Sequence, residues 1–331
     1  MKKIVTFLFA FVFISIFSVN TVRAAVTETE PNNSTQQATE ISLNTEYSGC
    51  VFDADDIDDE DFYKVYMEEN SFYKISIYNL KDNAEYGWKT LIVSYLNNSN
   101  SESSDGSDID IPDNYGNSTV LVKADYSGYH YIAFWNTQNT SYSFKVEKYS
   151  PKGKIYFDND SNKYKFLNNN ELEFCKVASK RKTSFSFPYS LNISRIDNME
   201  VLDYSDDEYG IVSIGKYAFK GSSIKNIYID ESIKKIGVGA FQNCKKLGTR
   251  KYMMGVVISG KRVVIEKNAF AGCKKLGSIR IVKGASVKSV GKNALKNTKK
   301  NIRIEVPSVK KYQKMFKKSG AKRAVFSKTY I

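Results

Sequence analysis

Apolar residues in the C-terminal part of the chain recur in a fixed pattern, Ile-Gly-x-x-Ala-Phe, which continues to a Cys and a Leu in its fullest copies. The copies are anchored by an aromatic residue or Leu, namely Phe219, Phe241, Phe270 and Leu295. The steps between anchors are 22, 29 and 25 residues. A unit of this length cannot bury its apolar face alone, so we expect the copies to stack as a solenoid.

Short strands are predicted between these turns. Ile227 and Ile229 are two residues apart, as are Ile279 and Ile281, which is the spacing of inward-facing residues in a strand. Residues 248–255 are expected to loop out as an insertion. After the last strand, Ser308 is the predicted N-cap of a helix that closes the stack, and its apolar stripe is Val309, Tyr312, Met315 and Phe316.

The N-terminal part of the chain alternates apolar and polar residues with period two. Clusters of Asn, Ser, Asp and Gly separate the alternating segments, which are 62–66, 73–77, 119–122, 129–135 and 142–146. Many short segments of this kind are typical of an antiparallel β-sandwich, here of about seven or eight strands.

Two families share these motifs. The pattern Ile-Gly-x-x-Ala-Phe-x-x-Cys-x-x-Leu resembles the BspA-like leucine-rich repeats of bacterial surface proteins over residues 209–306. This resemblance implies an extracellular binding scaffold without catalytic residues. Residues 28–149 resemble the bacterial pre-peptidase C-terminal domain, which accompanies secreted peptidases and includes collagen-binding modules. The matching motifs are Glu-x-Glu-Pro-Asn from Glu28, Asp-x-Asp-x-Tyr from Asp59, and Ser-Gly-Tyr-His-Tyr from Ser127.

The expected fold class is mostly β, an N-terminal antiparallel β-sandwich followed by a leucine-rich-repeat β-solenoid with a C-terminal capping helix. The expected division is a signal peptide, the sandwich, a linker that caps the solenoid with degenerate coils, the repeats, and a capping helix with a tail. These segments span 1–24, 26–149, 150–208, 209–306 and 307–331. The cap is expected because the exposed end of a repeat stack needs atypical units.

The first residues have the pattern of a secretory signal peptide. A basic Met-Lys-Lys start precedes an apolar run over 4–17, and cleavage is expected after Ala24. We therefore expect a secreted monomer, extracellular or associated with the cell surface. No later stretch is long and apolar enough to predict a membrane span in the mature chain.

The charge is unevenly distributed. Residues 26–150 carry 22 acidic and 7 basic side chains, whereas residues 209–331 carry 4 acidic and 30 basic ones. Lys-Lys pairs recur in the repeats, and they predict a row that binds a polyanion: Lys234, Lys235, Lys245, Lys246, Lys274 and Lys275. The alternative is that these lysines only keep the surface hydrated. Nucleic acid is not expected as a partner of an exported protein without a binding motif, whereas an anionic glycan or wall polymer fits.

The four cysteines predict no metal site, because none has a C-x-x-C neighbour. Cys244 and Cys273 occupy the same position in two repeats, so they are expected inside the solenoid as free thiols rather than as a disulfide. Cys50 and Cys175 have no nearby cysteine in the sequence.

Calcium is expected in the N-terminal module. Seven carboxylates fall within the nine residues 53–61, and such a density repels itself unless a cation offsets it. The resemblance to the pre-peptidase C-terminal domain assigns the ligands Glu28, Glu30, Asn32, Asn33, Asp53, Asp58 and Asp61. Asn33 stands where the binding modules of that family tend to carry Asp, and the insert 97–114 is longer than in the family. The alternative is a hydrated acidic loop.

Catalysis is not expected from the sequence. His130 is the single histidine, and it lies in an aromatic strand without a nucleophile motif beside it. The leading hypothesis is a secreted, non-enzymatic binding or adhesion protein that contacts an extracellular matrix protein, glycan or wall polymer. The alternatives are an accessory or envelope-structural module that docks a secreted enzyme, and a cryptic glycosidase or peptidase.

Overall fold

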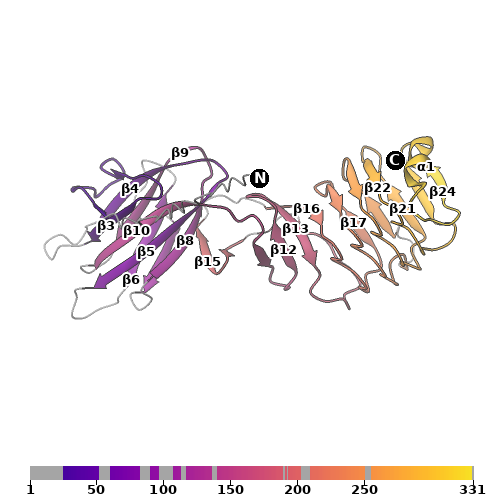
Figure 1. Ribbon diagram of the computed structural model, residues 1–331, viewed down its shortest axis with the longest axis horizontal. Coiled ribbons are helices and arrows are strands. Elements are labelled where there is room, and N and C mark those ends of the chain that lie inside the picture. The colour runs from indigo at the N-terminus through magenta and orange to yellow at the C-terminus, as the bar shows by residue number, and fades with distance from the viewer. Residues whose placement is uncertain are drawn as a thin grey trace, which may run out of the picture.

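The computed structural model describes residues 25–51, 60–82, 90–96, 107–112, 117–135, 140–188, 191, 193–202, 209–249 and 255–329. The chain forms two β-rich bodies that follow one another along the long axis of the molecule (Figure 1). The N-terminal body, mostly indigo to magenta, is a β-sandwich, and the C-terminal body, from rose through orange to yellow, is a solenoid. The predicted fold class is confirmed.

The sandwich consists of two sheets. The first has the spatial order β1 (Val26–Thr27), β3 (Glu46–Val51), β10 (Thr140–Tyr149), β5 (Phe72–Asp82), β8 (Asn117–Lys123), β15 (Met199–Leu202) and β14 (Arg195–Ile196). The second has the order β2 (Thr39–Glu40), β4 (Glu60–Met67), β9 (Gly128–Trp135), β6 (Thr90–Leu96) and β7 (Ser107–Pro112). As the alternation predicted, every second side chain of a strand points into the space between the two sheets. Tyr63, Tyr73, Phe134 and Phe144 are fully buried there.

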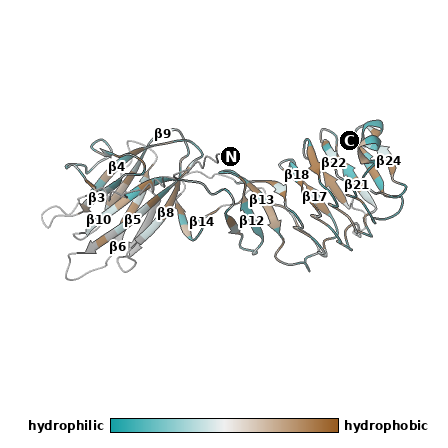
Figure 2. Ribbon diagram, in the orientation of Figure 1, coloured by the Kyte–Doolittle hydropathy of each residue, from teal (hydrophilic) through white to brown (hydrophobic). Residues whose placement is uncertain are grey.

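The solenoid also has two sheets. One runs β11 (Ile155–Phe157), β12 (Lys163–Phe166), β13 (Glu171–Lys176), β16 (Gly210–Ile214), β18 (Lys235–Ile236), β20 (Val263–Ile265) and β22 (Val287–Val290). The other runs β17 (Ile227–Ile229), β19 (Val256–Ile258), β21 (Ser278–Ile281), β23 (Arg303–Val306) and β24 (Val325–Lys328). Figure 2 shows hydrophobic residues concentrated on these strands and hydrophilic residues on many of the turns.

The predicted terminal helix is α1 (Val309–Phe316), the one helix in the described part of the chain. Its Tyr312 and Phe316 are buried against the end of the stack, as the apolar stripe predicted. Ser308 occupies the N-cap, although its side chain makes no capping hydrogen bond.

A column of aromatic rings forms the core of the solenoid. Successive ring centroids of Phe174, Phe219, Phe241 and Phe270 are 4.8, 4.9 and 5.1 Å apart, with interplanar angles of 16°, 8° and 5°. All four side chains are fully buried. The expected stacking of the repeat anchors is therefore confirmed, and Phe174 of β13 extends the column one coil before the first copy of the motif.

The residue before Ala-Phe in each copy explains part of the repeat pattern. This position has a positive φ of about 60° in every copy, where the residues are Tyr217, Gly239, Asn268 and Asn293. Gly and Asn tolerate this left-handed conformation, whereas a bulky residue such as Tyr does so at a cost. The Gly that follows Ile in the motif is explained by close packing between coils. A Cβ on Gly237 would lie 2.7 Å from the carbonyl oxygen of Ile214 in the previous coil.

Residues 150–208 are shared between the two bodies. Strands β11, β12 and β13 extend one solenoid sheet, whereas the β14–β15 hairpin joins the sandwich by parallel pairing of β15 with β8. The hairpin covers what would otherwise be an exposed strand edge at β8. At the junction the ring of Tyr209 stacks on Phe72 with centroids 6.4 Å apart. The hydrophobic core of the solenoid therefore extends to Phe72 and Leu121 of the sandwich, whereas the core between the two sandwich sheets is a separate cluster.

Candidate functional site

Three carboxylates meet at one end of the sandwich. Glu28 and Glu30 follow β1, and Asp61 lies near the start of β4. One carboxylate oxygen of each lies within 4.8 Å of those of the other two. Asp61 is fully buried, Glu28 is partly buried and Glu30 is exposed. The structure thus brings together the carboxylates of three of the seven residues predicted as calcium ligands.

Hydrogen bonds hold two of these carboxylates in place. Glu28 Oε1 accepts from the backbone N–H of Cys50 at 2.8 Å, and Glu28 Oε2 accepts from the Tyr63 hydroxyl. The Tyr142 hydroxyl donates to Asp61 Oδ2 at 2.6 Å. The two hydroxyls are themselves 3.0 Å apart. The acidic cluster is therefore fixed by long-range contacts between β3, β4 and β10.

The two tyrosines cannot ionise easily in this environment. Burial raises the pKa of Tyr63 far above its usual value, and the neighbouring Glu28 and Asp61 charges raise it further. Burial likewise raises the pKa of Tyr142, with Asp61 as the next cause. Both hydroxyls therefore remain hydrogen-bond donors, and they offset part of the repulsion among the carboxylates.

Asn32 lies against the same carboxylates and is fully buried. One end of its amide is 3.2 Å from both Glu30 Oε2 and Asp61 Oδ1. If Nδ2 occupies this end, the amide donates to both carboxylates. If Oδ1 occupies it, Nδ2 donates to Glu28 Oε2 at 3.4 Å and three oxygens face one another. The second arrangement repels itself unless a cation lies among the oxygens.

The remaining predicted ligands are less well defined. The Oδ1 atom of Asn33 is buried and has no hydrogen-bond partner among the described residues. Asp53 and Asp58 lie outside the described residues. The sequence interpretation did not include Tyr142, because its contact with Asp61 joins residues 81 positions apart.

The predicted lysine row divides into two groups. Lys234 binds Glu171 with an Nζ–Oε1 distance of 2.7 Å, and Lys235 lies 3.5 Å from Glu173. These two lysines are thus neutralised by β13. The other four predicted lysines are exposed and have no ion-pair partner among the described residues: Lys245, Lys246, Lys274 and Lys275.

The unpaired lysines lie on adjacent coils. The backbone of Gly248, just after the first pair, approaches the carbonyl oxygen of Lys275, and Gly277 lies against the side chain of Lys299. Lys299 and Lys300 are exposed and continue the row by one coil. The sequence analysis missed them because the anchor of that copy is Leu295 and its Cys position is Thr298. We call the six lysines 245, 246, 274, 275, 299 and 300 the lysine row.

The side chain of His130 is packed and hydrogen-bonded inside the sandwich. Its imidazole is fully buried and stacks on Tyr126 with ring centroids 4.3 Å apart. Nε2 lies 3.1 Å from the Tyr126 carbonyl oxygen, so it carries the proton, and Nδ1 accepts from the Tyr95 hydroxyl at 2.7 Å. Burial lowers the pKa of the ring. These contacts leave neither ring nitrogen available to a substrate.

The cysteines at the repeat position are free thiols inside the solenoid, as expected. Cys244 Sγ donates to the carbonyl oxygen of Phe219, and Cys273 Sγ donates to that of Phe241, both at 3.0 Å. Each thiol therefore links its coil to the preceding one. Cys50 and Cys175 are partly buried, and neither forms a disulfide with a described residue.

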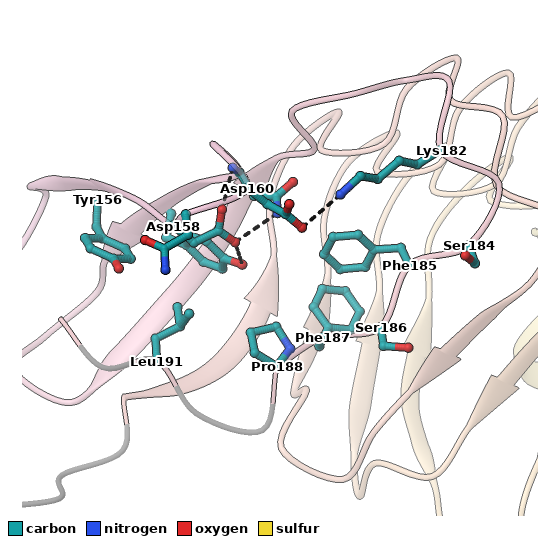
Figure 3. A pocket seen from close by; sticks show the side chains of 13 residues that line it. Tyr156, Asp158, Asp160, Lys182, Ser184, Phe185, Ser186, Phe187, Pro188 and Leu191 are labelled. Carbon is teal, nitrogen blue, oxygen red and sulfur yellow. Dashed lines mark hydrogen bonds and ion pairs between the residues drawn. The ribbon is translucent and has the colours of Figure 1, made fainter.

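A hollow of about 560 Å³ opens at the first coils of the solenoid (Figure 3). Asp158 holds one wall, because its carboxylate accepts from the backbone N–H of Asn162 at 2.7 Å and from the Tyr164 hydroxyl at 2.8 Å. Lys182 binds Asp160 at 2.8 Å across the opening. Phe185 and Phe187 line another side. The acidic residues of this hollow are thus occupied in internal bonds.

Comparison with known proteins identifies a matching family and a similar solved structure. Residues 166–261 and 250–330 match the family described as BspA type leucine rich repeat region, in six copies. This range is wider than residues 209–306, where the sequence motif is evident. No curated protein matches the chain.

Among solved structures, the chain is similar to the pre-peptidase C-terminal domain of a collagenase from Bacillus anthracis. The identity is 16%, the TM-score is 0.24, and the alignment covers 33% of this chain and 94% of that one. No helix among the described residues has the length and apolar character of a membrane span.

Proposed function

Because its repeat region, residues 166–330, belongs to the BspA-type leucine-rich repeat family, we propose that this protein is an exported, non-enzymatic binding or adhesion protein. Its ligand on the repeats is an anionic polymer, such as an acidic glycan or a wall polymer. The observation that supports this ligand is the lysine row, whose six exposed lysines lie on three adjacent coils and have no ion-pair partner within the part of the chain that the structure describes. Like charges held this close cost free energy unless an anion neutralises them.

The geometry of the row favours a linear ligand. Neighbouring coils are about 5 Å apart, as the 4.9 and 5.1 Å spacings of the Phe219, Phe241 and Phe270 rings show. A polymer with regularly spaced anionic groups can contact each coil in turn when it lies along the solenoid axis. The two ion-paired residues, Lys234 and Lys235, are left out of this contact surface.

The test is binding of dextran sulfate and of purified teichoic acid by the full chain. Four neutralised charges should make the affinity fall on the order of a hundredfold between 50 and 200 mM salt. The variant with Lys245, Lys246, Lys274 and Lys275 changed to Gln should lose most of this binding. The matched control changes four lysines of or beside α1 to Gln: Lys310, Lys311, Lys314 and Lys317. An equal loss of affinity in both variants, or an affinity that does not change with salt concentration, would contradict the proposal.

We further propose that the acidic cluster of the sandwich holds a calcium ion. Glu28, Glu30 and Asp61 supply carboxylate oxygens, and the Oδ1 atoms of Asn32 and Asn33 supply amide oxygens, all of which suit this hard cation. The burial of Asn33 Oδ1 without a hydrogen-bond partner in the described ranges supports its inclusion. The ion would tie the segment after β1 to β4 and so stabilise the sandwich.

Calcium binding is tested by titration calorimetry and by thermal unfolding with calcium or with a chelator. A calcium concentration a hundredfold above Kd should stabilise the folded state by about 2.7 kcal/mol. Glu30→Gln should reduce the effect, whereas Glu69→Gln, which removes the same charge elsewhere in the sandwich, should not. The proposal fails if the wild-type melting temperature does not respond to calcium.

A further inference from the structure

The two sheets of the solenoid begin at different places. One sheet starts with β11, β12 and β13 before β16, whereas the facing sheet starts only at β17. Among the described strands, β17 therefore has a neighbour, β19, on one side only. Its other edge faces the chain that follows β13.

The backbone of Tyr228 points toward this open edge. Ile227 donates its N–H to the Gly255 carbonyl at 3.0 Å, and the Ile229 carbonyl accepts from Ser259 at 2.9 Å. In a parallel ladder the bonded residues alternate, so the intervening Tyr228 directs its N–H and C=O away from β19. No described residue pairs with these two groups. The Tyr228 side chain is 54% exposed.

The chain after β13 begins to pair with this coil and then leaves it. Thr183 accepts from the N–H of Lys225 at 2.9 Å, in line with the start of β17. The following Phe185 and Phe187 pack on Phe174 instead, with ring centroids 4.9 and 5.5 Å away. Figure 3 shows both rings on the segment that separates the hollow described above from the rest of the solenoid.

A second hollow of about 660 Å³ lies between this segment and β17. Ser186 and Phe187 line one side, and Tyr228 with Asp230 and Glu231 lines the other. The hollow is thus bounded by an open strand edge, an aromatic ring and two carboxylates. A short extended segment of polypeptide has the matching backbone groups for that edge.

The carboxylates of Asp230 and Glu231 are unusual because this half of the chain is strongly basic. Residues 209–331 contain four acidic side chains, of which Glu305 binds Arg280 and Glu266 accepts from the N–H of Val238. The other two are Asp230 and Glu231. They are adjacent, and neither has an ion-pair partner among the described residues. Asp230 Oδ1 accepts from the backbone N–H and the hydroxyl of Ser232. A local negative site in a strongly basic array selects a positively charged ligand.

We propose that β17 accepts an extended basic segment of a partner protein as an additional strand. The N–H and C=O of Tyr228 pair with the backbone of that segment, and Asp230 and Glu231 bind its Lys or Arg side chains. An apolar side chain of the segment lies over Phe187. This site differs from the lysine row in place and in ligand charge, so it extends the proposed function to a protein partner.

The probe is a fluorescein-labelled peptide, Thr-Val-Lys-Val-Lys-Val-Lys-Val-Thr, titrated into the full chain and followed by anisotropy. Two further peptides carry N-methyl groups, one on each alternate set of residues. In strand addition only one set faces β17, so methylation of that set should abolish binding and methylation of the other should leave it within about threefold. A peptide with Glu in place of Lys should bind at least about tenfold more weakly.

Two variants locate the site. Tyr228→Pro removes the N–H and should weaken binding about tenfold, whereas Tyr228→Thr keeps the N–H and should weaken it less. The double variant Asp230→Asn with Glu231→Gln should remove most of the preference for Lys over Glu peptides. Thermal unfolding checks that each variant is folded. If Tyr228→Pro does not fold, the two methylated peptides still test strand addition to the wild-type protein.

Several outcomes overturn the proposal. Equal binding of the two methylated peptides excludes strand addition, and equal binding of the Lys and Glu peptides excludes the carboxylate contact. Failure of the parent peptide to bind at millimolar concentration excludes both. If the free protein forms a concentration-dependent dimer that Tyr228→Pro abolishes, the edge is occupied by a second copy of the chain instead.

Discussion

The sandwich and the solenoid differ in the polar side chains that they bury. In the sandwich the carboxylate of Asp61, the amide of Asn32 and the imidazole of His130 are all fully buried. Between residues 209 and 306 the buried polar side chains of the described residues are two serines, Ser213 and Ser222. The charge of the solenoid lies on its surface.

The difference follows from how each body is held together. A coil of the solenoid is stabilised by an identical neighbour, so apolar residues repeated in register suffice. The sandwich instead joins distant segments, and its polar cluster links Glu28, which follows β1, with Asp61 of β4 and Tyr142 of β10. A buried polar network of this kind responds to pH and to ions, whereas an apolar column does not. Changes in the two bodies should therefore have different signatures.

The largest expected effect is in the aromatic column. Phe241→Ala should lower the free energy of unfolding by about 3–5 kcal/mol, because it leaves a cavity between two stacked rings. Chemical denaturation followed by tyrosine and tryptophan fluorescence measures this loss. The calcium response of the sandwich should persist in the variant. A loss below about 1 kcal/mol would show that the column does not hold the solenoid together.

The next effect compares one buried hydroxyl in each body. Tyr142→Phe removes the hydroxyl that donates to Oδ2 of the buried Asp61 carboxylate and should cost about 1–3 kcal/mol. Tyr312→Phe removes a hydroxyl that only accepts from the N–H of Val287 at 3.2 Å, and should cost about 1 kcal/mol.

Thermal unfolding in calcium and in chelator separates these two variants. Calcium should reduce the cost of Tyr142→Phe, because the cation replaces the lost hydroxyl in neutralising Asp61. The cost of Tyr312→Phe should be the same in both conditions. A calcium-dependent cost in both variants would contradict the assignment of the ion to the sandwich.

A pH titration should distinguish the bodies by their histidine content. Burial lowers the pKa of His130, the single histidine, below its usual value near 6.5. The folded state therefore binds this proton less readily than the unfolded state, and stability should fall as the pH drops below about 6.5. Urea unfolding at pH 7.5 and 5.5 measures the change. His130→Gln should remove this part of the pH dependence, and an unchanged dependence would assign it to other groups.

The smallest effects are expected on the surface of the solenoid. Lys274→Gln should change stability by no more than about 0.5 kcal/mol, and in the stabilising direction, because it relieves repulsion along the lysine row. Lys235→Gln should instead destabilise by up to about 1 kcal/mol through loss of its ion pair with Glu173. Denaturant unfolding at low salt compares them. Equal effects of the same sign would contradict the division of the lysines.

Several features followed from the sequence alone because they depend on neighbours in the chain. The spacing of Phe219, Phe241 and Phe270 predicted the column, since each coil repeats the same local conformation. The apolar stripe of residues 309–316 predicted α1 from its helical period. The buried free thiols of Cys244 and Cys273 followed from their shared repeat position.

Other features were decided by tertiary contacts. Nothing local distinguishes Lys234 and Lys235 from the lysine row, because their partners Glu171 and Glu173 lie some 60 residues earlier, on β13. The contact of Tyr142 with Asp61 and the pairing of β15 with β8 likewise join segments far apart in the chain. The open edge of β17 exists because the chain after β13 turns its phenylalanines into the core instead of completing a strand. A periodic sequence pattern determines the local conformation of each coil. Only the folded chain determines which distant segments contact one another.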